Sequence, residues 1–138
     1  MLKTKRSKIL RILEWCQKNL GQKVKTHYPK LHVYNSDGSS ISGFSLYGHY
    51  DNNRNIITVF LKTHKNLLSL CDTVIHEFNH FLIDQEDRYA YTKIHLKMKR
   101  AGFSEFEITK KHPHEKKCNK IANKYAQLCY MQIKRNNK

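Results

Sequence analysis

The spacing of apolar residues along the chain predicts a helix, then a group of short strands, and then further helices. Residues 7–20 carry an apolar stripe at helical spacing, and Gly21 follows at a position where many helices end in a left-handed residue. The stripe consists of Ile9, Ile12, Leu13, Cys16 and Leu20. We therefore expect an amphipathic helix near the start of the chain.

Three short strands are predicted after this helix. They cover residues 31–34, 44–50 and 55–61, and the last of them is rich in β-branched side chains. A turn-rich segment at 35–40 separates the first two strands, and residues 51–54 have the composition of a hairpin connection. The last two strands should therefore pair antiparallel.

Helical spacing returns in the second half of the chain. Helices are predicted over residues 67–85 and 87–101, the second of them ended by Gly102, whereas residues 103–112 are expected to be irregular. The buried side of the second helix should consist of Tyr91, Ile94, Met98 and Ala101.

A last helix is predicted over residues 113–133, with Pro113 in the favoured first position. The basic tail at 134–138 is expected to fray. The apolar stripe of this helix consists of Cys118, Ile121, Ala122, Tyr125, Leu128 and Cys129.

These elements predict an α+β fold, in which a small, twisted, mainly antiparallel sheet of about three strands packs on helix 67–85 and further helices. The length and the composition, 39% hydrophobic and 27% charged, suit a single globular domain over 1–138. No stretch approaches the roughly 20 apolar residues of a membrane span, and no secretory signal is recognisable. The absence of both signals indicates a cytoplasmic protein, in which the four cysteines should be reduced. Because they form no CxxC pair, a structural site of four cysteines is not expected.

Residues 76–80 form an HExxH motif, His-Glu-Phe-Asn-His, in the middle of helix 67–85. Four residues make just over one helical turn, so His76 and His80 leave the same face about 6 Å apart along the axis. Two imidazoles so placed suit one tetrahedral Zn²⁺, and Glu77 lies on the same side, where it can take a proton from a water molecule. The motif predicts metal-assisted hydrolysis, most often of a peptide bond.

The two faces of this helix differ in character. The apolar face should pack against the core and consists of Cys71, Val74, Ile75, Phe78 and Leu82. The opposite face consists of Thr73, His76, Glu77, His80 and Asp84.

A catalytic zinc ion takes a third protein ligand and keeps one position for water. Glu115 lies three and seven residues before Cys118 and Ala122, so it continues the buried stripe of the last helix and is the favoured ligand. Asn119, one turn beyond, is placed to hydrogen-bond a ligating imidazole. The other candidates, with His114 next in preference, are His95, His112 and His114.

The combination of residues 76–80 with Glu115 and Asn119 resembles the gluzincins, the thermolysin-like clan of zinc peptidases. The run 112–122 is similar to the HPxExxAN helix of small viral and bacterial minigluzincin-like proteins, although Lys117 and Cys118 depart from the commoner form. The segment from Gly48 to Val59 also resembles the strands that precede the motif in that group, and the whole resemblance covers roughly residues 28–130.

The resemblance implies a zincin-like fold, with a small twisted sheet above the active-site helix, further helices behind it and a cleft between. It implies that His76, His80 and Glu115 bind zinc, and that Glu77 is the general base that later passes its proton to the leaving amine. The group that steadies the oxyanion in larger relatives is a Tyr or a His. The candidates here are Tyr89, Tyr91 and His95.

The order of elements and the resemblance also suggest where a substrate binds. Strand 44–50 would be the sheet edge that borders the cleft, and a peptide or protein substrate would lie extended along it.

The formal net charge is +15, from 26 Lys and Arg against 11 Asp and Glu. The positive residues are scattered from end to end, so a solvated surface is favoured over one that binds nucleic acid. Two alternatives stay open beside a zinc peptidase. One is an SprT-like protease acting on proteins bound to nucleic acid, which needs His112 or His114 as the third ligand. The other is a non-catalytic zinc-containing protein that binds nucleic acid or serves as a scaffold.

Overall fold

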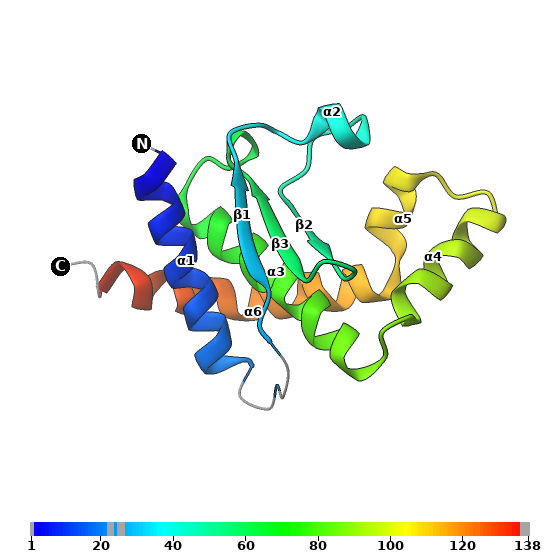
Figure 1. The fold of residues 1–138 in the computed structure, drawn as a ribbon. Coiled ribbons are helices and arrows are strands. Elements are labelled where there is room, and N and C mark those ends of the chain that lie inside the picture. The colour runs from blue at the N-terminus through cyan, green and yellow to red at the C-terminus, as the bar shows by residue number, and fades with distance from the viewer. Residues whose placement is uncertain (1, 22–23, 25–26, 136–138) are drawn as a thin grey trace.

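A small sheet packs with one face on helices in the computed structural model, which describes residues 2–21, 24 and 27–135 (Figure 1). The helices are α1 (Leu2–Asn19), α2 (Ser39–Ser42), α3 (Leu67–Glu86), α4 (Ala90–Arg100), α5 (Glu105–Lys111) and α6 (Pro113–Arg135), with a 3₁₀ turn η1 at Leu61–Thr63. The strands are β1 (Lys30–Tyr34), β2 (Gly48–Asp51) and β3 (Ile56–Phe60). The predicted α+β class is confirmed.

The three strands form one sheet in the order β1-β3-β2. β2 pairs antiparallel with β3, with Gly48 opposite Val59, which confirms the predicted hairpin. β1 pairs parallel with β3, with Lys30 opposite Ile56, so the sheet is mixed. β2 is an edge strand, as expected from the order of elements.

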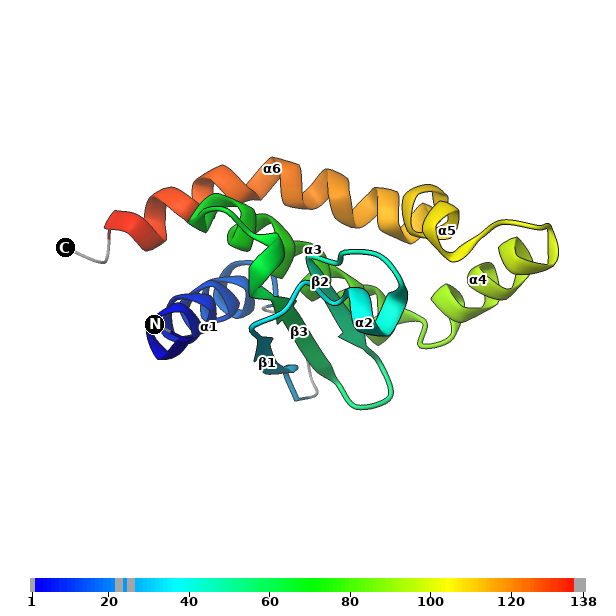
Figure 2. The ribbon, with the colours of Figure 1, turned by 90° about the horizontal axis from the view of Figure 1, so that it is seen from above.

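α3 lies between the sheet and α6, and α1 packs beside it (Figures 1 and 2). The predicted apolar face of α3 is buried, since Cys71, Val74, Ile75 and Phe78 are all 0% exposed. Burying an aromatic or branched side chain of this size stabilises a fold by about 1.5–3 kcal/mol. Packing of this face against the hydrophobic core therefore fixes the rotation of α3 about its axis. The HExxH residues lie on the other face of the helix.

The first turn of α3 is capped by Asn66, whose side chain accepts a hydrogen bond from the N–H of Ser69 at 2.8 Å. Such a cap satisfies a backbone donor that has no partner within the helix. The observed helix agrees with the predicted 67–85 to within one residue.

Two glycines matter for different reasons. Gly102 has a φ of 97° after α4, a conformation that side chains rarely adopt, so its predicted place at the end of a helix is confirmed. Gly21 does not have a positive φ. A Cβ on Gly21 would lie 2.8 Å from Cζ of Phe78, so a close approach of α1 and α3 requires glycine there.

The strand predicted at 44–50 is shorter than expected, because only Gly48–Asp51 pairs with β3. β3 ends at Phe60 and turns into η1, so no ladder continues opposite Leu46. The N–H of Leu46 instead donates to O of Asp37 at 2.7 Å, and its O accepts from Oγ1 of Thr63 at 2.6 Å. The turn-rich segment before it also contains the short helix α2.

The prediction of an irregular segment at 103–112 is wrong, because Glu105–Lys111 forms α5. Ser104 and Glu107 make a capping box, with the Ser104 hydroxyl accepting from the Glu107 N–H at 3.2 Å and the Glu107 carboxylate accepting from the Ser104 N–H at 3.0 Å. This reciprocal pairing starts a helix that carries too few apolar residues to show a periodic stripe.

Other differences concern the ends and exposed faces of helices. α1 begins at Leu2 rather than at residue 7, and residues 5–8 of this first part are exposed and carry no apolar stripe. No residue of α4 is fully buried, and Ala101 is exposed. Leu128 is 47% exposed and does not belong to the buried stripe of α6. The predicted fraying tail begins within α6, which ends at Arg135, and its remainder, 136–138, lies outside the described residues.

None of the helices in the described part of the chain has both the length and the apolar character that crossing a membrane requires.

Candidate metal centre

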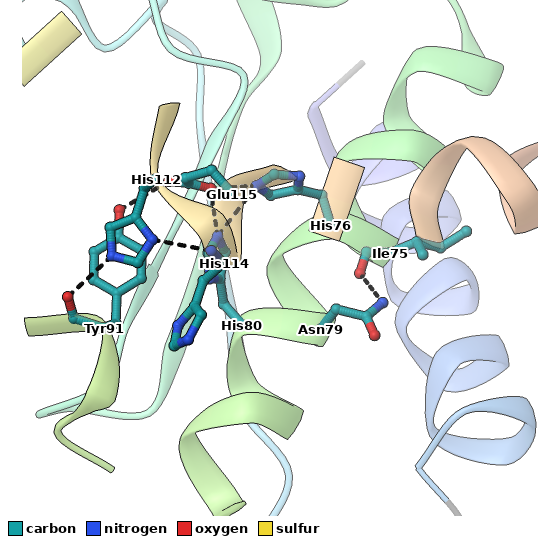
Figure 3. Close-up of polar contacts among 8 residues, drawn as sticks. All are labelled: Ile75, His76, Asn79, His80, Tyr91, His112, His114 and Glu115. Atoms are coloured by element: carbon teal, nitrogen blue, oxygen red, sulfur yellow. Dashed lines mark hydrogen bonds and ion pairs between the residues drawn. The ribbon is translucent and has the colours of Figure 1, made fainter. Parts of the chain in front are cut away.

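Two histidines of α3 and one glutamate of α6 converge on one point (Figure 3). Nε2 of His76 and Nε2 of His80 lie 3.2 Å apart, as expected for imidazoles one helical turn apart. Oε1 of Glu115 lies 2.8 Å from Nε2 of His76 and 2.6 Å from Nε2 of His80. Within the described residues, no other group of three His, Cys, Asp or Glu side chains brings its donor atoms so close together.

Glu115 reaches this point because α6 docks on α3 along its buried stripe. It stands in the first turn of α6, is only 8% exposed, and shares its face with the fully buried Cys118 and Ala122. The prediction that Glu115 continues this stripe is confirmed. Pro113 begins the helix, where its missing N–H costs no hydrogen bond.

The three donor atoms fit a tetrahedral metal ion. Ligand bonds of 2.0–2.1 Å at tetrahedral angles place the donors about 3.3–3.4 Å apart. The observed separations of 2.6, 2.8 and 3.2 Å are shorter, so the side chains need to move apart by less than about 1 Å to admit an ion. The side chains of His76, His80 and Glu115 are 15%, 11% and 10% exposed, so the centre is accessible from solvent.

The electrostatics of the centre also suit a cation. Burial disfavours the charged form of His76, but Glu77 and Glu115 outweigh it and raise the pKa of His76 to about 9. Burial likewise disfavours the ionised form of Glu115, but the hydrogen bonds and charges of His76 and His80 hold its pKa well below the usual range. The carboxylates thus attract positive charge to the point where the two imidazoles meet.

Glu77 is buried beside the centre without belonging to it. It is 7% exposed, and its carboxylate is not among the three groups that converge. β2 lies directly over it: a Cβ on Gly48 would be 3.4 Å from Cγ of Glu77 and 2.6 Å from Cγ2 of Thr73. Glycine at position 48 therefore permits the edge strand to cover the face of α3 that carries Glu77.

Tyr91 of α4 contacts Oε2 of Glu115, the carboxylate oxygen that does not face the imidazoles. Its OH donates a hydrogen bond to Oε2 of Glu115 at 2.9 Å. Its ring stacks on His112 with centroids 3.9 Å apart and meets the ring of His80 edge-on at 5.3 Å. Burial and the nearby charge of Glu115 raise the pKa of Tyr91, so the phenol keeps its proton and remains a donor. Tyr91 thus holds Glu115 in the orientation that points Oε1 at the imidazoles.

This contact gives a prediction about metal affinity. Tyr91→Phe removes the hydroxyl that orients Glu115 and should weaken zinc binding about 10–100-fold, the usual cost of losing an outer partner of a metal ligand. Tyr89→Phe is the matched control, because Tyr89 is 61% exposed and has no contact with the centre. Competition with a chromophoric chelator measures both affinities. Equal affinity in the two variants would contradict the role of Tyr91.

His112 is a structural residue rather than a ligand. It is 0% exposed, its Nε2 lies 3.0 Å from O of Tyr91, and its Nδ1 accepts a hydrogen bond from the N–H of His114 at 3.0 Å. A carbonyl can only accept, so the proton lies on Nε2. Both ring nitrogens are engaged, and the residue joins α4 to the start of α6. In the sequence, the only sign of this role is the position of His112 directly before Pro113, which begins the last helix.

The remaining candidates lie outside the centre. Asn119 is exposed and makes no hydrogen bond to either imidazole, so its predicted role is wrong, and Tyr91 supports the ligands instead. His114 does not join the three converging groups, and its buried Nδ1 has no hydrogen-bond partner among the described residues. His95 lies 2.9 Å from Glu105, and Tyr89 is exposed. Of the three residues named for the oxyanion, the structure brings only Tyr91 to the centre.

Comparisons with family models, with curated proteins and with solved structures found no match to this chain. A function is therefore inferred from the chemistry of the centre.

Proposed function

We propose that this protein is a zinc-dependent peptidase. The observation that carries the proposal is the convergence of His76, His80 and Glu115 within 4.8 Å of one another, next to a buried carboxylate that is not part of the set. Three protein donors leave one tetrahedral position for water or substrate, as in catalytic rather than structural zinc sites. The four cysteines are free and buried, which supports a reducing, cytoplasmic location for the enzyme.

Each residue of the centre has a separate role in the proposed hydrolysis. His76, His80 and Glu115 would hold the ion, and Tyr91 would orient Glu115 through Oε2. When bound, Zn²⁺ lowers the pKa of a water molecule and polarises a carbonyl group. The carboxylate of Glu77 would take a proton from the attacking water and deliver it to the nitrogen of the leaving amine.

The edge strand β2 offers a binding site for the main chain of a peptide. The N–H of Phe60 donates to O of Tyr47 at 3.1 Å. Hydrogen-bonded and non-hydrogen-bonded residue pairs alternate along an antiparallel ladder, so this bond shows which residues of β2 bond to β3. The backbone groups of His49 therefore point toward β3, whereas those of Gly48 and Tyr50 point to the open edge. A substrate that pairs with these groups is recognised through its backbone, so we expect broad specificity.

Exchanging the amide N–H of Tyr50 for an ester oxygen tests this site. Incorporating the α-hydroxy analogue of tyrosine keeps the side chain and all bonds to β3, but removes one outward donor. We expect kcat/KM to fall about 2–12-fold, the equivalent of one hydrogen bond. The same exchange at Val33 is the control, because the bond from the N–H of Lys30 to O of Asn55 turns the N–H of Val33 to the outer edge of β1, on the opposite side of the sheet. Equal activity of the two variants would exclude main-chain binding at Tyr50.

The experiment that tests the function is peptide hydrolysis under control of the metal. The zinc-loaded protein is incubated with a mixture of unstructured peptides, and products are identified by mass spectrometry. Cleavage should stop when 1,10-phenanthroline removes the metal and return when Zn²⁺ is added back. Cleavage that persists in the metal-free protein, or its absence from zinc-loaded protein across a diverse peptide set, would overturn the proposal.

A further inference from the structure

The outer face of α6 carries a row of positive side chains with no acidic residue among them. The exposed basic residues of this helix are Lys116, Lys117, Lys120, Lys124, Lys134 and Arg135. The only acidic residue in the helix is Glu115, which is buried in the metal centre. We call these six residues the basic row.

Helical geometry places the basic row on one side. At 3.6 residues per turn, its six side chains fall within an arc of about 100°, and the span from Lys116 to Arg135 is about 28 Å. The buried residues of α6 fall within an arc of about 80° on the opposite side. They are Glu115, Cys118, Ala122, Ala126, Cys129 and Ile133. Figure 2 shows α6 along one edge of the molecule, with α3 on its inner side and no described element beyond it.

The charges of the row are not neutralised within the described structure. No residue of the basic row forms an ion pair with another described residue, whereas Lys99 pairs with Glu105 and Lys111 with Glu107 outside α6. Lys124 lies over the ring of Tyr125 and Lys134 donates to the OH of Tyr130, contacts that leave both charges intact. An uncompensated row of this kind creates a positive potential along one straight surface.

We propose that the basic row is a docking surface for nucleic acid, which it binds through the phosphate backbone without reading sequence. The six cations form two groups about 15 Å apart, Lys116 to Lys124 and Lys134 with Arg135. Their whole span of about 28 Å equals about eight base pairs of a duplex, in which each strand carries one charge per about 3.4 Å. Five of the six cations are Lys, a point charge that suits single phosphates, whereas recognition of bases favours Arg.

A membrane surface fits this face less well. Its exposed apolar side chains are limited to Leu128 and Met131, 47% and 54% exposed. An interfacial helix needs a continuous apolar face to enter the lipid headgroups, and the corresponding face of α6 is already buried against α3.

The row lies on the side of α6 opposite Glu115, so nucleic acid bound there leaves the metal centre free. A peptidase docked in this way would reach proteins that share the same nucleic acid. The binding itself does not rest on the proposed peptidase activity, because no residue of the row belongs to the centre.

The test is binding of a fluorescent 30-base-pair duplex of arbitrary sequence to the full chain, measured by anisotropy as a function of salt. The basic-row variant carries Lys116→Gln, Lys120→Gln and Lys124→Gln. The matched variant carries Lys93→Gln, Lys97→Gln and Arg100→Gln on the exposed side of α4. Each variant lowers the formal net charge of +15 by three, so general attraction weakens equally in both.

We expect Kd for the wild type to rise roughly 2,000-fold between 50 and 200 mM salt, as phosphate contacts by all six cations imply, and roughly 40-fold for the basic-row variant, which keeps three of them. The α4 variant should behave as the wild type, and Lys→Arg at the three row positions should keep binding. Equal loss in both variants would show that diffuse charge, and not the row, attracts the duplex. No binding of the duplex at 50 mM salt, or row-dependent binding to vesicles containing phosphatidylserine but not to the duplex, would also overturn the proposal.

Discussion

Glu77→Gln should retain bound zinc and thermal stability but lose peptide hydrolysis by about 10²–10⁴-fold, the usual effect of removing a general base. Glu77 is buried beside the three converging donors and is not one of them. The amide has nearly the same size as the carboxylate, so the packing of β2 over α3 should be preserved. The substitution therefore removes only the ability of the side chain at position 77 to accept a proton.

Asp84→Asn provides the control for this substitution. Asp84 lies two turns further along α3, on the same face, and is also partly buried. The change from acid to amide is the same, but Asp84 hydrogen-bonds Asn52 and does not approach the centre. Steady-state hydrolysis of one peptide and zinc content are measured for both variants. Wild-type turnover in Glu77→Gln would rule out Glu77 as the base.

Glu115→Ala should lower zinc affinity by more than the about 10–100-fold that typically follows loss of an outer partner, because it removes a ligand itself. Oε1 of Glu115 is the only carboxylate oxygen in the converging set, and it lies within 2.8 Å of both imidazoles. Without it, two histidines on a single helix would have to hold the ion with solvent. Zinc content after dialysis and affinity by chelator competition measure the effect.

His114→Ala distinguishes the two third ligands considered from the sequence. Its neighbour Glu115 supplies the donor in the structure, while the imidazole of His114 stays outside the converging group. Zinc affinity should therefore be close to that of the wild type. If His114→Ala loses the metal and Glu115→Ala keeps it, the assignment of Glu115 is wrong and a peptidase with three histidine ligands is favoured.

The centre is largely predictable from sequence because its parts are local. The spacing of His76 and His80 needs only one helical turn, and the stripe that buries Glu115 follows from the periodicity of α6. That the two helices meet is not encoded in either pattern alone. It follows once α3 and α6 bury their apolar stripes against each other.

The contacts of α4 with α6 are not predictable in this way. Tyr91 reaches Glu115 across 24 positions of the sequence, and His112 reaches the backbone of Tyr91 across 21. These bonds depend on where the exposed helix α4 returns toward the core, and no periodic pattern records that path. Asn119 illustrates the same limit, because four residues turn it about 40° from Glu115, which places it just beyond the buried arc of α6.

Local signals were also available where the pattern of apolar residues was not informative. Ser104 and Glu107 have the spacing of a capping box, which marks the start of α5 in a segment with little periodicity. The basic row of α6 was present in the sequence as well. It forms a single surface because the opposite face of α6 is buried. That buried face contains Glu115, the only acidic residue of the helix, so the exposed side carries no acidic charge.

The most direct test of the proposed metal centre is a crystal structure of the purified protein with anomalous data collected at the zinc and iron absorption edges. Imidazole and carboxylate ligands suit both metals, so the edges establish which one is bound. We expect one zinc peak per chain, about 2.0–2.2 Å from Nε2 of His76, Nε2 of His80 and a carboxylate oxygen of Glu115, with no fourth protein ligand. A peak bound by His114, a fourth protein side chain on the ion, or no peak at these residues would contradict a catalytic zinc site.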